Sequence, residues 1–487
     1  MSFVPAWQLR AAFARRLSAM YGAEVPAYTT LVEVSTEVNT DVAAADPAGA
    51  ERLGSIHRVT AERHGAIRVG SPRELAEVAR VFGAFGMSPV GFYDLRDAAA
   101  SAVPVVSTAF RPTTADELAR NPFRVFTSML TPGDRRFFDP ELGAQVEAFV
   151  ASRQLFGPEL LELADAAIAG GGLRDDDAER LLELATGAFE LSAEPVDHDW
   201  YRRLERVSAV AADIAGVTST HINHLTPRVL DIDQLYDRME RRGITMIDEI
   251  QGPPRWNGPD VLLRQTSFRA LDEERSFRFA DGTEGPGALR VRFGEVEARG
   301  IALTPAGRDR YDELLTETDR RLAADPDGPA EAGPSGDGPR IRALGTPRQR
   351  TARTVWAAGL PDTESGLAEQ GLGWFSYTVG EDSVVRGGEH DLADLVAGGV
   401  LVAEPIVYED FLPRSAAGIF QSNLTGEGTR DASRSGEDYD LARLSELIGV
   451  AIADPQRLYA ARRTESLAAA ADRLGISIRT EPIGDRS

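Results

Sequence analysis

The sequence of 487 residues contains neither cysteine nor lysine. The absence of cysteine excludes disulfides, iron–sulfur clusters, thiolate zinc sites and cysteine nucleophiles. The absence of lysine excludes Schiff-base chemistry, pyridoxal phosphate attachment and the lysine of a phosphate-binding P-loop. All 53 basic residues are therefore arginines, and histidine carries much of the remaining information about a possible active site.

Positive charge is also scarce, because 53 basic residues face 76 acidic ones and the net charge is −23. A strongly acidic surface disfavours nucleic acid as a partner. No apolar run is long enough to span a membrane, and the first residues carry charges too often for a secretory signal. With 43% hydrophobic residues the chain can bury a core, so we expect a soluble, cytoplasmic protein with no membrane partner.

Hydrophobic periodicity predicts an α+β chain in which helical blocks alternate with groups of strands. Helical patterns cover most of residues 1–60, 139–217, 303–324 and 437–475, and one further helix follows Ser71, a plausible N-cap. Strand patterns lie at 64–70, 88–95, 103–110, 123–130, 260–268, 275–280, 289–300, 371–379 and 398–411. No glycine-rich dinucleotide fingerprint follows a strand, so a regular βαβ series is not expected.

Two of the segments that contain histidine are informative. His64 opens a predicted strand and Arg68 follows four residues later, so the two side chains share one face and can line the same cavity. The alternative is a surface strand with two solvated groups. His221 and His224 are three residues apart, which is a possible metal-ligand spacing, although Pro227 favours an irregular turn here and a helix-capping role remains open.

Glu295 and Glu297 share one face of a predicted strand. Two carboxylates on one face repel unless a cation lies between them or water covers that face. Two histidines and one carboxylate from separate segments form the facial triad of non-haem Fe(II) enzymes, which leaves coordination positions open for substrate and oxygen. Spacing alone does not decide whether such a triad exists or which glutamate belongs to it.

Seven blocks together resemble the 2-oxoadipate dioxygenase/decarboxylase family, also called hydroxyglutarate synthases. They are HGAIRVG (64–70), STAFRP (107–112), NPFRVFTSML (121–130), INHLTPRVLDID (222–233), LLRQTSFRAL (262–271), FGEVEARGIALTPAGRDRYD (293–312) and VYEDFLPRSAAGIFQSNL (407–424). The resemblance extends to about residue 470. Long blocks in matching order make it specific.

The resemblance implies an Fe(II) enzyme whose metal ligands are His64, His224 and Glu295, with His221 and Glu297 as close neighbours. It also implies a central module related to the vicinal oxygen chelate fold, in which curved antiparallel or mixed sheets enclose the metal and helical blocks surround them. The reaction would convert 2-oxoadipate and O2 to 2-hydroxyglutarate and CO2, as in lysine breakdown.

Substrate binding follows from the same resemblance. Arg68 matches an arginine that grips a substrate carboxylate, and Arg414 and Ser415 lie in a substrate-contacting loop. Arg414 stands where the family usually has a small apolar residue, which leaves the preferred substrate length open. Further candidates, equally plausible as structural partners, are Arg111, Arg124, Arg264 and Gln265.

We therefore expect one large catalytic domain over residues 1–475 and a tail over 476–487. Its metal-binding sheets would come from segments 64–130, 220–300 and 371–424, with a helical insert at 139–217 and a mobile insert, rich in proline and glycine, at 325–340. The residues do not indicate the oligomeric state or the stereochemistry of the product. Alternatives are a glyoxalase-type isomerase, an extradiol dioxygenase or a non-catalytic protein that binds 2-oxo acids.

Overall fold

The computed structural model describes residues 2–61, 63–97, 102–270, 273–289, 292–328, 346–381, 385, 387–412, 430, 434 and 436–480. Most of the predicted insert at 325–340 lies outside these ranges. In the described part of the chain, every helix is too short or too polar to cross a lipid bilayer.

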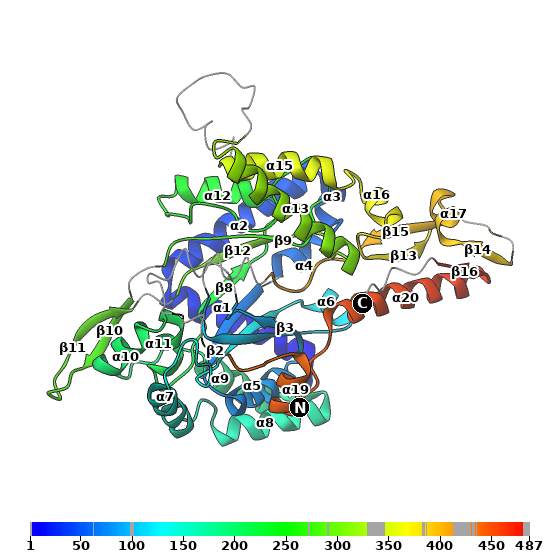
Figure 1. The fold of residues 1–487 in the computed structure, drawn as a ribbon. Coiled ribbons are helices and arrows are strands. Elements are labelled where there is room, and N and C mark those ends of the chain that lie inside the picture. The colour runs from blue at the N-terminus through cyan, green and yellow to red at the C-terminus, as the bar shows by residue number, and fades with distance from the viewer. Residues whose placement is uncertain are drawn as a thin grey trace.

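Helices and strands alternate in blocks, which confirms the predicted α+β class (Figure 1). The helices are α1 (Ala6–Glu24), α2 (Pro26–Ala45), α3 (Pro47–Glu51), α4 (Ile56–Ala61), α5 (Pro72–Ala84), α6 (Ala115–Arg120), α7 (Pro140–Ser152), α8 (Pro158–Gly170), α9 (Asp175–Gly187), α10 (His198–Glu205), α11 (Ala209–Ala215), α12 (Ile232–Arg241), α13 (Pro305–Ala324), α15 (Pro347–Gly359), α16 (Glu364–Glu369), α17 (Leu392–Ala397), α19 (Leu441–Ile448) and α20 (Pro455–Leu474). The strands are β1 (Phe3–Pro5), β2 (Arg63–Val69), β3 (Ser88–Asp94), β4 (Val105–Arg111), β5 (Arg124–Leu130), β6 (Gly172–Arg174), β7 (Val196–Asp197), β8 (His224–Pro227), β9 (Leu263–Ser267), β10 (Glu273–Arg278), β11 (Glu284–Leu289), β12 (Glu295–Arg299), β13 (Phe375–Val379), β14 (Glu389–Asp391), β15 (Leu401–Pro405) and β16 (Ser477–Arg479).

A five-stranded mixed sheet in the order β3-β4-β5-β2-β8 lies at the centre of the molecule. β2 and β5 are parallel, and the other neighbours are antiparallel. Because side chains alternate along a strand, the residues of β2 divide into two sets. Ile67 and Val69 lie on one face, and His64, Ala66 and Arg68 share the opposite face; Ala66 joins Ile67 and Val69 in the larger hydrophobic core.

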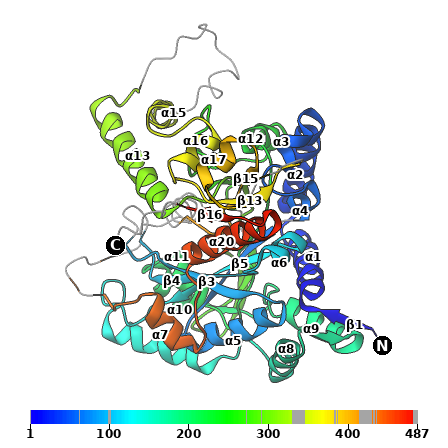
Figure 2. The ribbon, with the colours of Figure 1, turned by 90° about the vertical axis from the view of Figure 1, so that its right-hand side faces the viewer.

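Helices α5, α8 and α9 lie below the central sheet in Figure 1 and Figure 2. α5 begins as predicted, because the Ser71 side chain accepts a hydrogen bond from the Glu74 backbone N–H. The Glu74 carboxylate in turn accepts hydrogen bonds from the Gly70 backbone N–H and from Arg153. These bonds fix the chain where β2 ends and α5 begins.

The two-stranded sheet formed by β12 and β9 continues the central sheet beyond β8. The Val229 N–H donates a 2.8 Å hydrogen bond to the Glu297 carbonyl oxygen, next to a bridge between Arg228 and Glu297. Asn39 of α2 closes the same corner, since its amide donates to the Arg228 carbonyl oxygen and its oxygen accepts from the Leu230 N–H. β2, β8 and β12 therefore lie next to one another.

A second hydrophobic cluster packs around β13, β15, α13, α15 and α20, and includes Trp356, Phe375 and Tyr459. α13 begins at the predicted cap, where Thr304 accepts from the Gly307 N–H. The predicted tail contains β16, which pairs with β14. The division of the chain into domains stays a prediction.

Two local expectations were wrong. The single strand predicted over 289–300 is two strands, because β11 ends at Leu289 in a hairpin with β10 and β12 begins at Glu295. The polar segment around His224 forms strand β8 rather than an irregular turn. Pro227 is tolerated because β8 is the edge strand of the five-stranded sheet, where a missing backbone donor is least costly.

Candidate metal centre

Three strands that are far apart in the sequence bring His64, His224 and Glu295 together. Their nearest nitrogen and oxygen atoms all lie within 4.8 Å of one another, and all three side chains are buried. His224 reaches His64 because it is paired with Ala66 across the antiparallel contact of β8 with β2. The two imidazole rings are 5.4 Å apart and meet edge to face.

The arrangement of these atoms suits a cation. Glu295 reaches both rings, with Oε2 3.5 Å from His64 Nε2 and Oε1 3.4 Å from His224 Nδ1. Both ring nitrogens of His224 are buried without a hydrogen-bond partner among the described residues. Orphaned buried polar atoms require a partner such as an ion or water. Two imidazoles and one carboxylate are a donor set that first-row transition metals accept.

Protonation favours metal binding at one ring in particular. Burial lowers the pKa of the His224 imidazole well below its usual value, so this ring is neutral and offers a lone pair. Burial also raises the pKa of Glu295, partly opposed by His64. A divalent cation between these groups would offset the cost of burying the Glu295 carboxylate.

Glu297 lies behind His64 rather than beside both rings. Its Oε2 is 3.0 Å from His64 Nδ1, and its carboxylate accepts two hydrogen bonds from Arg299, at 2.7 and 2.8 Å. Arg299 and His64, against the effect of burial, lower the pKa of Glu297 to about 2. An ionised carboxylate at Nδ1 holds the ring in the tautomer that leaves Nε2 available to a metal.

Arg68 lies on the same face of β2 and forms a buried ion pair with Asp213 of α11. Asp213 also accepts a 2.9 Å hydrogen bond from the Asn223 amide and lies 3.2 Å from His221 Nε2. His221 therefore neighbours Arg68 and is not part of the three-residue group. Burial opposes ionisation of Asp213, but His221 and Arg68 hold the pKa of its carboxyl well below the usual range.

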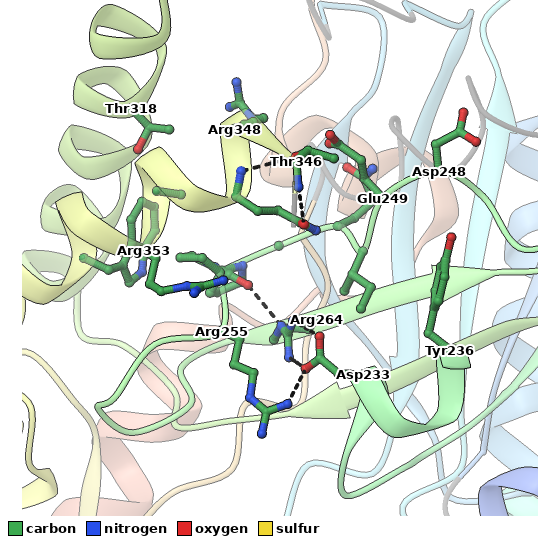
Figure 3. A pocket seen from close by; sticks show the side chains of 18 of the residues that line it. Asp233, Tyr236, Asp248, Glu249, Arg255, Arg264, Thr318, Thr346, Arg348 and Arg353 are labelled. Atoms are coloured by element: carbon green, nitrogen blue, oxygen red, sulfur yellow. Dashed lines mark hydrogen bonds and ion pairs between the residues drawn. The ribbon is translucent and has the colours of Figure 1, made fainter. Parts of the chain in front are cut away.

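The other predicted pocket residues divide between two places. Gln265 and Arg124 lie at the site, since Gln265 Nε2 is 3.4 Å from Glu295 Oε2 and Arg124 Nη1 is 3.5 Å from Glu297 Oε1. Arg264 instead alternates to the other face of β9, where both its terminal nitrogens bond to Asp233. That face borders a separate cavity of about 750 Å³ between α12 and α15 (Figure 3).

Sequence reasoning missed the buried acids of the segment that follows β15. Asp410 pairs with Arg111 through two hydrogen bonds, and Glu409 pairs with Arg124 at 2.6 Å. The next ring, Phe411, packs edge to face on His64 with centroids 5.0 Å apart. The adjacent acidic residues in the block VYEDF could have indicated a buried charged site, but the arginines that pair with them are far away in the sequence.

Tyr21 of α1 was also missed, although it joins two ligand-bearing segments. Its hydroxyl lies 3.0 Å from the carbonyl oxygen of Asn223, next to His224, and 2.8 Å from that of Phe293. The positions of β8 and β12 are thereby tied to one helix. The predicted substrate-loop residues Arg414 and Ser415 lie outside the described residues.

Comparisons with known proteins agree over almost the whole chain. A model of the family described as 2-oxoadipate dioxygenase/decarboxylase matches residues 13–423. The 2-oxoadipate dioxygenase/decarboxylase of Mycobacterium tuberculosis is 56% identical over 463 residues, which cover 94% of this chain and 97% of the relative. That of Pseudomonas putida is 39% identical over 488 residues, which cover 97% of this chain and 98% of the relative.

Solved structures give the same result. The crystal structure of the Pseudomonas putida hydroxyglutarate synthase in complex with 2-oxoadipate matches with a TM-score of 0.80 and 39% identity, covering 98% of this chain and 100% of the other. A second crystal structure of the Pseudomonas putida hydroxyglutarate synthase matches with a TM-score of 0.78 and 36% identity, at the same coverage.

Proposed function

The chain belongs to the 2-oxoadipate dioxygenase/decarboxylase family, and on this premise we propose that it uses Fe(II) to convert 2-oxoadipate and O2 into 2-hydroxyglutarate and CO2. The observation that carries the metal assignment is the buried group of His64, His224 and Glu295, in which neither His224 nitrogen makes a hydrogen bond within the described residues. From the family resemblance we also expect a place in lysine breakdown and a cytoplasmic location.

His64, His224 and Glu295 would hold the metal, and three protein ligands would leave coordination positions open for the 2-oxo acid and oxygen. A bound ferrous ion supplies the electrons and the Lewis acidity that oxidative decarboxylation and hydroxylation require. Iron suits this set better than softer metals because the donors are two imidazoles and a carboxylate, without sulfur.

The protein's own groups position the reactants around that centre. Glu297 would keep Nδ1 of His64 protonated and the ring fixed, because its carboxylate, which Arg299 holds ionised, lies 3.0 Å from that nitrogen. Arg68 would bind a substrate carboxylate, for which a planar guanidinium is well suited. The rings of Phe411 and Phe126, 5.0 Å apart, form an apolar wall beside His64 that would exclude water.

We further propose that the strands around the centre form a module of the vicinal oxygen chelate type. The support is topological: β2, β8 and β12 are neighbours, and each contributes one proposed ligand. The five-stranded sheet ends at β8, and a backbone hydrogen bond from Val229 to Glu297 joins it to the separate two-stranded sheet of β12 and β9, which favours strands arranged around the metal.

The test is anaerobic reconstitution with Fe(II), followed by oxygen uptake with 2-oxoadipate while the product mass is measured in the same vessel. We expect one O2 consumed and one CO2 released per 2-hydroxyglutarate formed. Isomerisation without oxygen uptake, or oxygen uptake without CO2, would replace the proposal with a glyoxalase-type or ring-cleaving activity. Tight binding of the acid with no turnover would indicate a binding protein.

A further inference from the structure

Thr226 lies between two of the proposed metal ligands in one row of side chains. On one side, it is paired with His64 across the antiparallel contact of β8 with β2. On the other side, a parallel bridge joins Arg228 to Glu297 of β12. Two residues earlier on both strands, Thr226 and Glu295 are therefore level with each other. Residues paired in this way point to the same face, so the Thr226 side chain is on the face that carries the metal centre.

Contacts before this pair support the same register. Two residues before Thr226 and its partner, His224 and Phe293 are level with each other, and their ring centroids are 5.4 Å apart. The Tyr21 hydroxyl lies within hydrogen-bonding distance of the carbonyl oxygens of both Asn223 and Phe293. The two strands therefore stay side by side on both sides of the row that contains Thr226.

The Thr226 hydroxyl is a buried polar group without a match. Its exposed fraction is 0%, and it makes no hydrogen bond in the part of the chain that the structure describes. Thr127 and Thr266 share both properties. Thr127, however, is paired with the core residue Ile67, on the other face of the central sheet. Thr266 is paired with the core residue Val296, on the other face of β12. Of these three threonines, Thr226 is the one that faces the metal centre.

Glu295 is less well supplied with donors than its neighbour. The Glu297 carboxylate accepts two hydrogen bonds from Arg299, at 2.7 and 2.8 Å. The Glu295 carboxylate meets the two imidazole rings and, at 3.4 Å, the amide of Gln265. When a metal occupies the imidazole nitrogens, those nitrogens no longer donate to Glu295. A carboxylate that binds a metal is normally held by hydrogen bonds from neighbouring groups, and the Thr226 hydroxyl is an unused donor in the same row.

We propose that Thr226 is a positioning residue of the metal centre, whose hydroxyl donates to the Glu295 carboxylate when the metal is bound. The hydrogen bond would fix which carboxylate oxygen Glu295 presents to the metal. Without the metal the hydroxyl stays unpaired, which is unfavourable for a buried group. This inference rests on the proposed function, because it assumes that His64, His224 and Glu295 hold the metal.

The test measures metal binding by the full-length protein rather than turnover. Mn²⁺, which accepts the same donors, is titrated calorimetrically, and melting temperatures are measured without metal and at saturation. Thr226→Val removes the hydroxyl and keeps the shape, so we expect it to weaken Mn²⁺ binding about tenfold. The rise in melting temperature that Mn²⁺ produces should shrink accordingly. The metal-free variant should melt no lower than the parent, because an unpaired buried hydroxyl has been removed.

Thr226→Ser and Thr266→Val are the matched controls. Thr226→Ser keeps the hydroxyl and should bind Mn²⁺ within about threefold of the parent protein. Thr266→Val removes an equally buried, unpaired hydroxyl from the face of β9 that points away from the metal, and should leave Mn²⁺ affinity unchanged. If Thr226→Val does not fold, Thr226→Ala replaces it.

Three results would overturn the role of Thr226. They are unchanged Mn²⁺ affinity in Thr226→Val, equal weakening in Thr226→Ser, which would assign the effect to packing of the methyl group, and equal weakening in Thr266→Val. If the parent protein binds no Mn²⁺, the proposed function itself fails.

Discussion

The Nδ1 atom of His64 lies 3.0 Å from Oε2 of Glu297, on the opposite side of the imidazole ring from the nitrogen that faces Glu295. Glu295 and Glu297, which share one face of β12, therefore have different roles. Glu295 reaches both histidines, whereas Glu297 is occupied by Arg299 and by the far side of one ring. The period of the strand could not make this distinction, because both carboxylates share one face of β12; the family resemblance alone pointed to Glu295.

Glu297→Gln should weaken metal binding about 10- to 100-fold while the fold is kept, because the neutral amide no longer fixes the His64 tautomer. Calorimetric titration with Mn²⁺ or Fe(II) measures the change. Glu284→Gln, in the exposed hairpin of β10 and β11, is the control and should bind metal normally. Unchanged affinity in the Glu297 variant would show that the ring is oriented by its packing alone.

His224→Ala and Glu295→Ala should each abolish stoichiometric metal binding, because a buried site cannot retain a divalent ion with two ligands instead of three. Metal content after anaerobic reconstitution is the measurement, with His198→Ala as a control for the loss of a histidine outside the site. The metal should also raise the melting temperature of the parent protein and not that of the variants. A full complement of metal in either variant would refute the assignment of that ligand.

Arg68→Ala should keep the metal but weaken binding of 2-oxoadipate by about 30-fold or more, the usual cost of removing one partner of a buried charge pair. Arg68→Lys should restore little, since an ammonium group cannot reproduce the planar fork of hydrogen bonds. Binding of the diacid to the Mn²⁺-loaded protein separates these effects from turnover. Loss of metal in both variants would instead assign Arg68 to the support of the metal centre.

Tyr21→Phe should lower the free energy of unfolding by about 1–3 kcal/mol, because the one hydroxyl proton that two buried carbonyl oxygens share is lost. Tyr28→Phe is the control, since among the described residues its hydroxyl meets only Ser18, in a partly buried pair. Urea unfolding of both variants gives the comparison. Equal stabilities would show that water replaces the Tyr21 hydroxyl between β8 and β12.

Asp213 should make stability sensitive to acid. Its pKa is lower in the folded than in the unfolded protein, so its ionised form stabilises the fold above the ordinary aspartate pKa. This contribution is lost as the pH falls from about 4 towards the lower folded value. The difference in unfolding free energy between the parent and Asp213→Asn should therefore be greatest near neutral pH and shrink below pH 4. A constant difference from pH 7 to pH 3 would contradict this.

Local signals explain why much of the fold was predictable. The strand at 64–70, the cap at Ser71 and the helix after Thr304 depend on patterns within a few neighbouring residues, and the structure confirms all three. β8 was missed because proline and polar residues weaken the local pattern, while its pairing with β2 supplies the missing stability. That pairing depends on residues more than a hundred positions away.

The sequence indicated the kinds of residue at the candidate site, but not the residues that hold them in place. His64 and Arg68 could be placed on one face by the period of a strand, but the partners Asp213 and Glu409 come from elements whose packing no local pattern indicates. Arg264 is the opposite case, because the sequence made it a pocket candidate and the structure places it away from the metal centre. Its neighbour Gln265 reaches the site, and the alternation of β9 alone sends Arg264 to the other cavity.

The order of the three ligand strands along the chain bears on how the protein is made. β2 leaves the ribosome early, but β8 and β12 follow only after the whole helical stretch from α7 to α11. Until Glu295 has been synthesised, the nascent chain presents one face of β2 with its polar groups unmatched, and such long-range pairings form slowly. A metal ion can therefore bind at this centre only after β12 has been synthesised and the three distant segments have packed together. Chains truncated or stalled before Glu295 should bind no metal there.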